Sequence, residues 1–376
     1  MSAPGRAPRV LVSGVVLGQP MGGVRRHNQE LLPRVARLLA AEGGGLAVME
    51  GAVPAALELP EPIERLASGV PPGPPSLRAI GEGRALRGHL ERAAREGRPF
   101  DLVHTGHLPV PLRLPVPLTV TLHDLRNAEL AGRALARRLF GRRMLALALR
   151  AAAGVITVSE AVGRRLEELF DYPPTHWTAV PNAADHFEPL PRAAGPGAPL
   201  LHVGHLEPRK NLELLLEALA LDPGLPPLEL AGAAKGGEDE RLRRRAAELG
   251  VADRVRFPGP FDDAELPALY ARAGCVVMPS RLEGFGIPVL EAQRARAPLA
   301  ISSAGALVEV AGPGVPRFDP GDAAGCAAAL RSALAQPAEA LEEAARRAGR
   351  FSWDGSARLW VAAWGALQPR GTGGGR

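Results

Sequence analysis

The chain has 376 residues, more than one ordinary core needs, so two domains of about 180 residues each are expected. It is 46% apolar and 23% charged, a composition that supports sizeable cores and excludes an intrinsically disordered chain. The net charge of +5 comes almost entirely from arginine, and the few aromatic residues do not cluster beside basic ones, so nucleic-acid binding is not expected.

In the N-terminal half, short apolar runs alternate with amphipathic segments. Strands are predicted at residues 9–16, 46–49, 101–104, 118–122 and 154–158, and helices at 24–42, 86–96, 132–153 and 159–169. A glycine-rich loop at 18–23 follows the first strand, and the proline-rich segment 58–75 is expected to be a loop. Ser159 is expected to cap the helix that follows it. The alternation predicts a parallel, doubly wound sheet.

The pattern restarts after a segment rich in Pro, Gly and Ala at 188–199, which is the best candidate for a linker. Strands are predicted at 200–203, 228–230, 255–257 and 275–278, and helices at 211–219, 239–249, 263–271 and 351–367. Ligands in such folds bind beyond the carboxyl ends of the strands, so two facing domains would form a cleft.

The two cysteines, Cys275 and Cys326, are too few for a disulfide framework or a zinc site. Both lie in apolar or Ala-rich surroundings, so buried free thiols and a cytosolic location are expected. No run of about 18 apolar residues is present, so nothing is expected to span a membrane. Residues 1–8 also lack the apolar core of a signal peptide.

The most specific stretch covers residues 279–291 and reads PSRLEGFGIPVLE. Glu283 and Glu291 stand eight residues apart, with two glycines and Pro288 between them. Pro288 suits the first residue of a helix, and the glycines let the backbone approach a ligand closely. Both carboxylates can therefore face a small polar ligand over a helix N-terminus, where anions are favoured. The alternative is a strand–turn–helix connection with capping acids.

Two adjacent cations, Arg209 and Lys210, lie in the string VGHLEPRKN, after the first predicted strand of the second half. Cations at a helix start oppose the helix dipole unless an anion is bound there. A phosphate would turn them into a binding site, because arginine offers a bidentate fork and lysine a compact point charge. The chain has only one other lysine, Lys235. A phosphate site is therefore favoured over a solvated charged turn.

Three strings, TVSEAVGRRL, VGHLEPRKNLELLLEAL and PSRLEGFGIPVLEA, resemble the retaining glycosyltransferases of family 4 in their order and spacing. The resemblance covers most of the chain. It implies the α/β fold called GT-B, in which two Rossmann-like domains face each other across a cleft and a C-terminal helix crosses back to the N-terminal domain. The expected parts are an acceptor-side domain at 1–190, a nucleotide-sugar-binding domain at 191–350, the crossing helix at 351–368 and a disordered tail at 369–376.

The resemblance also implies an activity and roles for single residues. The enzyme would move a hexose from a nucleoside-diphosphate sugar, GDP-mannose or a UDP-sugar, to a hydroxyl of a glycan, lipid or small molecule. Arg209 and Lys210 would bind the donor diphosphate, Glu291 the ribose hydroxyls, and Glu283 would lie beside the transferred sugar. The implied donor-binding residues are Gly22, Gly23, Gly204, Arg209, Lys210, Glu283, Gly284, Phe285, Gly286 and Glu291. No metal and no cofactor beyond the donor substrate are expected.

The N-terminal domain supplies the acceptor side in this family. His123, in the string TLHD, matches a histidine near the donor sugar, and it joins Glu283, Arg209 and Lys210 as a catalytic candidate. A neutral histidine can hydrogen-bond a sugar hydroxyl. A satisfied structural histidine is the alternative. His104 and His107 are expected near the cleft without an assigned role.

Two residues depart from the family's pattern. His205 stands where many relatives have arginine, so part of the phosphate clamp is either lost or supplied by another residue. Arg296 replaces the usual glycine at the end of the helix that contains Glu291, which puts the turn geometry there in question. Relatives that share the EPRKN form often transfer mannose from GDP-mannose, which favours that donor.

Other functions stay open at this point. A sugar-nucleotide epimerase shares the GT-B fold, and a non-catalytic protein can keep the nucleotide-sugar pocket. A nicotinamide dehydrogenase is rejected, because the glycines after the first strand do not give the G-x-G-x-x-G spacing. The sequence determines neither the acceptor nor the oligomeric state.

An arginine-rich helix is predicted within 132–153. Its arginines are Arg133, Arg137, Arg138, Arg142, Arg143 and Arg150. Such a helix can touch anionic lipid, but a solvated face over a core-packed apolar stripe that includes Leu139 and Phe140 is favoured. Peripheral contact with the inner face of a membrane is the second possibility.

Overall fold

The computed structural model describes residues 6–18, 22–55, 57–129 and 135–367, which fall into two compact units. Unit 1 combines the chain up to Pro181 with the segment from Trp353 onward, and unit 2 runs from Asn182 to Ser352. This division precedes the boundary expected at 190, because the ring of Phe187 packs at 5.4 Å from the ring of Tyr270 in unit 2. The tail expected at 369–376 lies outside the described residues.

Unit 1 is built on a seven-stranded sheet in the order β3-β2-β1-β4-β5-β6-β7. Every neighbouring pair is parallel, as predicted. The strands are β1 (Arg9–Gly14), β2 (Gly45–Glu50), β3 (Ile63–Ala67), β4 (Leu102–Thr105), β5 (Leu118–Leu122), β6 (Gly154–Thr157) and β7 (Trp177–Ala179). The central strands β4 and β5 are buried along their whole length, which explains their short apolar runs.

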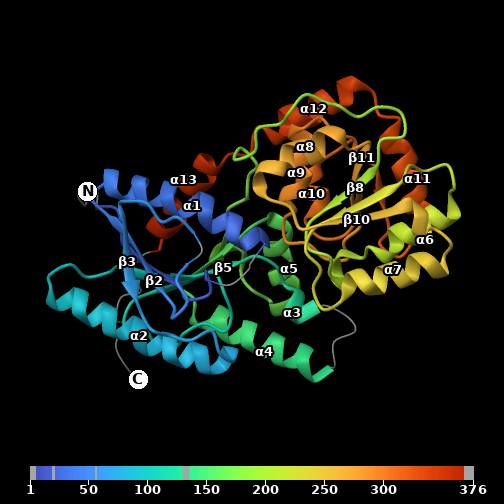
Figure 1. The fold of residues 1–376 in the computed structure, drawn as a ribbon. Helices are drawn as coiled ribbons and strands as arrows, with labels where there is room; N and C mark the ends of the chain where they lie inside the picture. The colour runs from blue at the N-terminus through green and yellow to red at the C-terminus, as the bar shows by residue number, and fades with distance from the viewer. Residues whose placement is uncertain (1–5, 19–21, 56, 130–134, 368–376) are drawn as a thin grey trace. The chain divides into compact units, whose positions relative to one another are not determined.

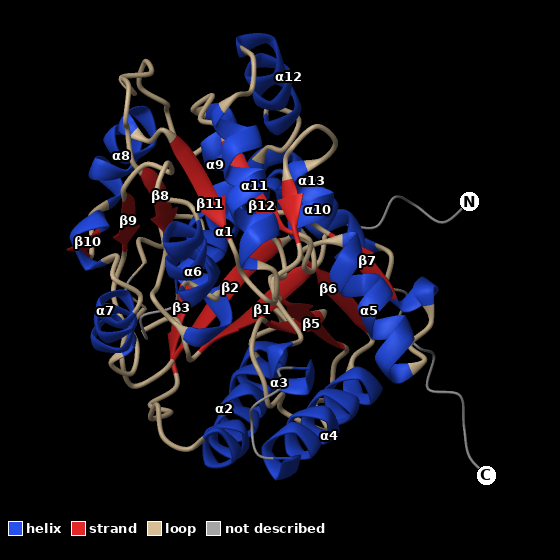
Figure 2. Cartoon of the chain, turned by 90° about the vertical axis from the view of Figure 1, so that its right-hand side faces the viewer, coloured by secondary structure: helices blue, strands red, loops and turns tan. Residues whose placement is uncertain are grey.

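Helices cover both faces of this sheet (Figures 1 and 2). They are α1 (Gly22–Ala41), α2 (Pro75–Arg95), α3 (Arg126–Glu129), α4 (Leu135–Ala151), α5 (Glu160–Phe170) and α13 (Trp353–Gly365). In both views α1 and α13 lie together on one face, and α2 and α4 lie on the other. The predicted cap of α5 is confirmed, because Ser159 Oγ accepts a hydrogen bond from Val162 N.

Unit 2 is built on a six-stranded parallel sheet in the order β10-β9-β8-β11-β12-β13. The strands are β8 (Leu200–Val203), β9 (Leu228–Ala231), β10 (Val255–Gly259), β11 (Cys275–Met278), β12 (Leu299–Ser302) and β13 (Arg317–Phe318). The helices are α6 (Glu213–Leu221), α7 (Glu238–Glu248), α8 (Leu266–Arg272), α9 (Ile287–Arg294), α10 (Leu307–Ala311), α11 (Ala323–Leu334) and α12 (Ala338–Ala348). Cys275 and Cys326 are buried free thiols, as predicted.

The strand order places a ligand-binding position in each unit. The direction of winding reverses between β1 and β4 in unit 1 and between β8 and β11 in unit 2. Open parallel sheets bind ligands at such switch points, beyond the carboxyl ends of the strands. The segments that follow β8 and β11 contain Arg209, Lys210 and Glu283.

Two expectations for the region between β2 and β4 are wrong. The segment 58–75 contains the edge strand β3, in which Ile63 is the only fully buried residue, so its apolar signal is weak. Helix α2 starts at Pro75, well before the expected start at residue 86. Its first turns bury Arg78 and Glu82 in place of apolar residues, so the apolar periodicity begins only at Leu86.

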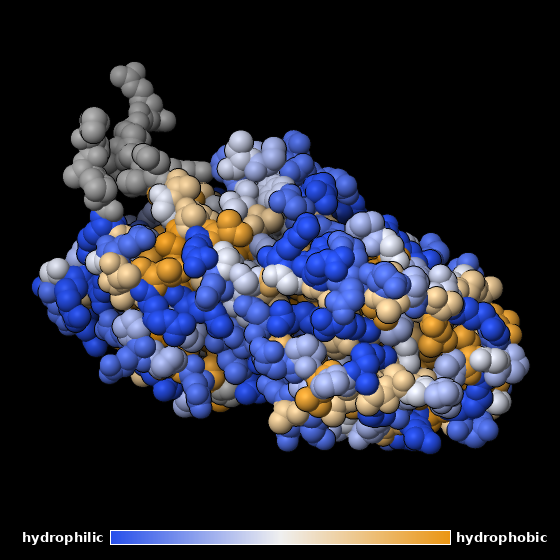
Figure 3. Space-filling model, turned by 90° about the horizontal axis from the view of Figure 1, so that it is seen from above, coloured by the Kyte–Doolittle hydropathy of each residue, from blue (hydrophilic) through white to orange (hydrophobic). Residues whose placement is uncertain are grey.

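Among the described residues, none of the helices combines the length and the hydropathy needed to cross a bilayer. On the face drawn in Figure 3, hydrophilic side chains predominate and hydrophobic ones gather in separate patches.

Candidate functional site

The sequence suggested that the two adjacent cations stand at the start of an α-helix, but the structure shows that they do not. Arg209 and Lys210 belong to a separate 3₁₀ turn, Pro208–Lys210, which Asn211 ends in a left-handed conformation with φ of 58°. The Asn211 side chain donates hydrogen bonds to the carbonyls of Pro279 (3.1 Å) and Pro320 (2.8 Å). The turn is therefore fixed to the segment after β11, and α6 begins only at Glu213.

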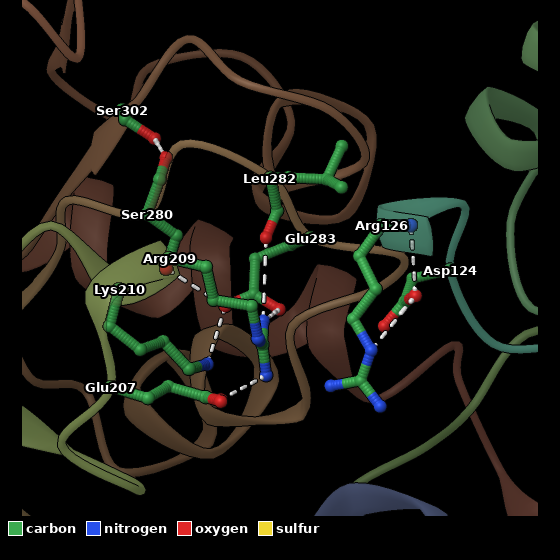
Figure 4. A network of polar contacts seen from close by, with 9 residues as sticks. All are labelled: Asp124, Arg126, Glu207, Arg209, Lys210, Ser280, Leu282, Glu283 and Ser302. Atoms are coloured by element: carbon green, nitrogen blue, oxygen red, sulfur yellow. Dashed lines mark hydrogen bonds and ion pairs between the residues drawn. The ribbon is translucent and has the colours of Figure 1, made fainter. Parts of the chain in front are cut away.

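The carboxylate of Glu283 is the point on which both cations converge (Figure 4). Arg209 Nη1 donates to one carboxylate oxygen at 2.9 Å, and Lys210 Nζ pairs with the other. Ser280 Oγ donates to the same oxygen as Lys210, at 2.8 Å. The hydroxyl of Ser302 donates to the Ser280 carbonyl at 2.6 Å and so supports this residue from β12. Ser280 and Ser302 were not predicted as site residues.

The charges of this cluster balance among its own side chains. Glu207 pairs with Arg209 at 2.8 Å, so two carboxylates face two cations. Burial opposes ionisation of Glu283, but Lys210 and Arg209 outweigh it and lower its pKa to about 2. Glu283 is therefore an ionised, buried carboxylate at neutral pH. Glu207 stands in the EPRK string two residues before Arg209, and this position in the sequence could have identified it as a member of the cluster.

The turn between Glu283 and α9 has the backbone that its glycines permit. Gly286 precedes α9 with φ of 98°, and a Cβ at this position would lie 2.7 Å from Leu307 Cδ2. Pro288 lies in the first turn of α9, as predicted. Gly284 is buried, and the buried ring of Phe285 packs 6.0 Å from the ring of Phe351, so the Phe285 side chain serves packing.

Glu291 has its own set of partners, separate from those of Glu283. Tyr270 Oη donates to Glu291 Oε2 at 2.7 Å, and His186 Nε2 lies 3.2 Å from Oε1. Burial raises the pKa of Tyr270 well above its usual value, and the Glu291 carboxylate raises it further. No local sequence pattern marks Tyr270, a buried residue of α8, or His186 as a site residue.

The loop after β8 contains Gly204 and His205. Gly204 has φ of 134° and donates its N–H to the Ala231 carbonyl, so it lies at the carboxyl ends of β8 and β9. Burial lowers the pKa of His205, and the nearby charge of Lys235 lowers it further. The backbone N–H of Lys235 donates to the Leu206 carbonyl at 2.9 Å. Both lysines of the chain therefore flank this loop, where the family pattern has an additional arginine.

His123 follows β5 in unit 1 and is partly exposed. Its ring meets the ring of buried His27 edge to face, with centroids 4.7 Å apart. Burial lowers the pKa of His123 well below its usual value, and His27, His104 and Arg126 lower it further. The imidazole is therefore neutral at physiological pH, and its Nε2 has no hydrogen-bond partner among the described residues. His27, which lies within the predicted first helix, was not singled out from the sequence.

His104 is a core residue. Its ring nitrogens lie 2.8 Å from Thr119 Oγ1 and 3.1 Å from Thr121 Oγ1, and the rings of Trp360 and Trp364 pack beside it. Burial lowers its pKa to about 3. It therefore supports the sheet and does not face a ligand.

His107 contacts a different set of residues from His104. Its Nε2 lies 3.0 Å from the carboxylate of fully buried Glu82, and its Nδ1 lies 3.0 Å from Thr105 Oγ1. Gly22 and Gly23 are exposed at the start of α1, while residues 19–21 of the same loop lie outside the described residues.

Comparison with known proteins connects both units to one enzyme family. Residues 21–186 match the model of Glycosyltransferase Family 4, and residues 193–350 match that of the glycosyl transferases group 1. A D-inositol 3-phosphate glycosyltransferase of Geodermatophilus obscurus is 33% identical over 75% of this chain and 64% of that protein. An O-antigen chain mannosyltransferase B of Escherichia coli is 32% identical over 53% and 57%, respectively. The matched region thus spans less than two thirds of these relatives.

Solved structures agree with this assignment at the level of the fold. Sucrose-phosphate synthase from Thermosynechococcus elongatus superposes with a TM-score of 0.76 at 20% identity, covering 96% of this chain and 99% of that one. HepE from Anabaena, in complex with UDP-glucose, superposes with a TM-score of 0.69 at 19% identity, covering 96% and 100%. With a parallel-sheet fold in each unit and both family models matched in chain order, the chain belongs to the GT-B glycosyltransferases of group 1 and family 4.

Proposed function

We propose that this protein is a retaining glycosyltransferase that moves a hexose from a nucleoside-diphosphate sugar to a hydroxyl acceptor. The observation that carries the proposal is the convergence of Arg209 and Lys210 on Glu283 at the switch point of unit 2. A fixed arginine fork beside a lysine ammonium is the arrangement that suits a diphosphate. The family membership supports the reaction class, and retention of configuration rests on the resemblance to retaining enzymes.

The charge balance suggests how the donor is used. Glu283 neutralises the two cations that a diphosphate would need. An incoming diphosphate competes for Lys210 and Arg209, and this frees lone pairs of Glu283 to accept a hydroxyl of the transferred sugar. As the bond to the leaving diphosphate breaks, negative charge grows on its oxygens, and fixed cations stabilise it more than they stabilise the ground state. The proposal therefore involves no metal ion.

Two donors deserve testing first. The Escherichia coli relative is named a mannosyltransferase, which supports GDP-mannose, and the fold neighbour HepE holds UDP-glucose, which supports a UDP-sugar. In either case Glu291 would accept the two ribose hydroxyls, oriented for that task by Tyr270 and His186. We place the reaction in the cytoplasm, where nucleotide sugars are substrates for such enzymes.

The first test is thermal unfolding of the purified chain with UDP-, GDP- and ADP-sugars. A ligand at a hundredfold excess over its dissociation constant stabilises the folded state by about 2.7 kcal/mol. Lys210→Ala and Glu291→Ala should abolish the shift, whereas Arg244→Ala should keep it. Arg244 is an exposed cation on α7 and serves as the matched control.

Measurements of turnover distinguish the transferase from an epimerase and from a binding protein. Release of nucleoside diphosphate that depends on an added hydroxyl acceptor supports the transferase, and NMR of the product gives its anomeric configuration. Conversion of the donor without an acceptor would indicate an epimerase. Binding without turnover would indicate a nucleotide-sugar-binding protein, and an inverted product would refute the retaining assignment.

A further inference from the structure

The basic charge of helix α4 is not neutralised within the described part of the chain. Its sequence, LARRLFGRRMLALALRA, contains five arginines and no acidic residue. Arg142 turns toward α5, where it donates to the Leu169 carbonyl at 3.3 Å and lies over the Phe170 ring. Arg138, Arg143 and Arg150 form no ion pair with a described carboxylate. The helix therefore presents uncompensated positive charge.

Helix α7 shows that this is not the rule for arginine-rich helices of the chain. Arg241 pairs with Glu213 at 2.6 Å and with Glu238 at 2.9 Å. Arg245 pairs with Glu213 and with Glu217. Helix α7 thus contains four acidic residues beside its four arginines and pairs two of these arginines with carboxylates, whereas α4 contains no acidic residue.

Two large apolar side chains project from the same part of α4. Leu139 is 56% exposed and Phe140 59% exposed, so the expectation that they belong to a core-packed stripe is wrong. Leu145 and Leu149 face the core instead. At 100° per residue, Arg143 and Arg150 lie within about 40° of Leu139 around the helix axis. Exposed apolar groups and unpaired guanidinium groups therefore share one face.

A cavity of about 370 Å³ adjoins the C-terminal end of this face. Arg150 contributes to its lining together with Leu149, Phe170, Tyr172 and His176. The cavity therefore combines largely apolar and aromatic walls with a cation that also belongs to the exposed face of α4.

We propose that the α4 surface, defined by Leu139, Phe140, Arg143 and Arg150, docks on an anionic phospholipid bilayer. Phenylalanine and leucine enter the boundary between headgroups and acyl chains, while arginine side chains extend to the phosphates. The unpaired positive charge selects an anionic surface, and the adjacent exposed apolar pair favours a bilayer over an acidic protein. This interaction is independent of the proposed transfer reaction, and its test requires no turnover.

Co-sedimentation of the full chain with vesicles tests the proposal. Binding is expected to vesicles of phosphatidylcholine with 30% phosphatidylglycerol, but not to pure phosphatidylcholine, and it should weaken with salt. Replacing Arg143 and Arg150 by Gln should weaken binding by about thirtyfold, from about a factor of five per arginine. Replacing Leu139 and Phe140 by Ser should weaken it by about tenfold or more.

Matched controls come from unit 2. Leu221→Ser removes an equally exposed leucine from the end of α6, and Arg244→Gln removes an exposed cation from α7, so neither should change vesicle binding. Thermal unfolding of each variant checks that it is folded. Equal binding to both vesicle types, or unchanged binding of the α4 variants, would overturn the proposal. So would absence of vesicle binding together with capture by polyglutamate, which would indicate an acidic protein partner, or competition by millimolar glycerol phosphate, which would indicate a headgroup pocket only.

Discussion

In unit 2 the candidate residues are charged and paired, whereas in unit 1 they are histidines that stay neutral. Arg209, Lys210 and Glu283 contact one another directly, and their charges hold the Glu283 carboxylate ionised. His123 and His104 lie among other rings and lose their charge to burial. The unit 2 cluster and His123 therefore suit different ligand groups, since His104 belongs to the core. A charged, balanced cluster can exchange its internal carboxylate for a phosphate, while a neutral imidazole can only donate or accept a hydrogen bond.

The largest effect is expected when a cation is removed from the unit 2 cluster. Lys210→Ala should lower kcat about 10²- to 10³-fold, because it removes a fixed charge that faces the leaving diphosphate. Steady-state kinetics with the donor found by thermal shift provides the measurement. Lys210→Arg should recover part of the loss, since the charge is kept. An unchanged kcat in Lys210→Ala would show that the cluster is structural only.

The stability of the protein in acid tests whether the contacts of Glu283 keep its carboxylate ionised. The folded pKa of about 2 lies below the ordinary value of 4.5, so this group stabilises the fold above pH 4.5 and the contribution is lost as pH falls toward 2. Between pH 7 and pH 3 the wild type should lose about 2 kcal/mol more unfolding free energy than Glu283→Gln. Urea unfolding at both pH values measures this difference, and equal losses would contradict the paired, ionised state.

A pH–rate profile tests the neutral state of His123. Because its pKa lies well below the ordinary histidine value, the imidazole stays uncharged between pH 6 and 8. It should therefore add no inflection to kcat/KM in that range. His123→Asn should lower kcat by about tenfold through loss of one hydrogen bond, with an unchanged profile. An inflection near pH 6.5 that disappears in the variant would mean that His123 works as a titrating acid or base.

A smaller effect is expected for a cation of unit 2 that lies outside the cluster. Arg296 has φ of 53°, in the left-handed region that favours glycine, and its side chain pairs with Glu342. Arg296→Gly should raise the unfolding free energy by about 0.5–1 kcal/mol, because relief of the backbone strain exceeds the value of an exposed ion pair. Thermal unfolding measures it, and nucleotide binding should not change. Destabilisation would mean that the Glu342 pair matters more than the backbone.

Much of the fold could be predicted because buried parallel strands read as short apolar runs. The expected strands at 118–122, 200–203 and 275–278 match β5, β8 and β11 residue for residue. Strand β3 was missed because it is an edge strand with one fully buried side chain, and the start of α2 was missed because that turn buries Arg78 and Glu82. Hydrophobic periodicity detects buried apolar side chains. It does not detect buried charged side chains or strands that pair at the edge of a sheet.

The candidate site was predictable only where its residues are adjacent in the sequence. Arg209, Lys210 and Glu283 stand in compact strings, and the structure places them in direct contact. Tyr270 and His186 reach Glu291 from distant segments, and His27 reaches His123 from α1, so no local pattern marks them. The left-handed Asn211 that separates the cations from α6 was also missed, because asparagine between a 3₁₀ turn and a helix has no distinct periodicity.

Helix α13 has a consequence for how the chain folds as it is made. Trp360 packs against His27 and His104, and Trp364 donates a hydrogen bond to Thr119 Oγ1, so the core of unit 1 depends on a segment that follows all of unit 2. A ribosome synthesises α13 only after it has synthesised all of unit 2. The histidine cluster of unit 1 therefore receives its tryptophan packing only after all of unit 2 has been synthesised, so unit 1 cannot complete its core as an N-terminal unit that folds first.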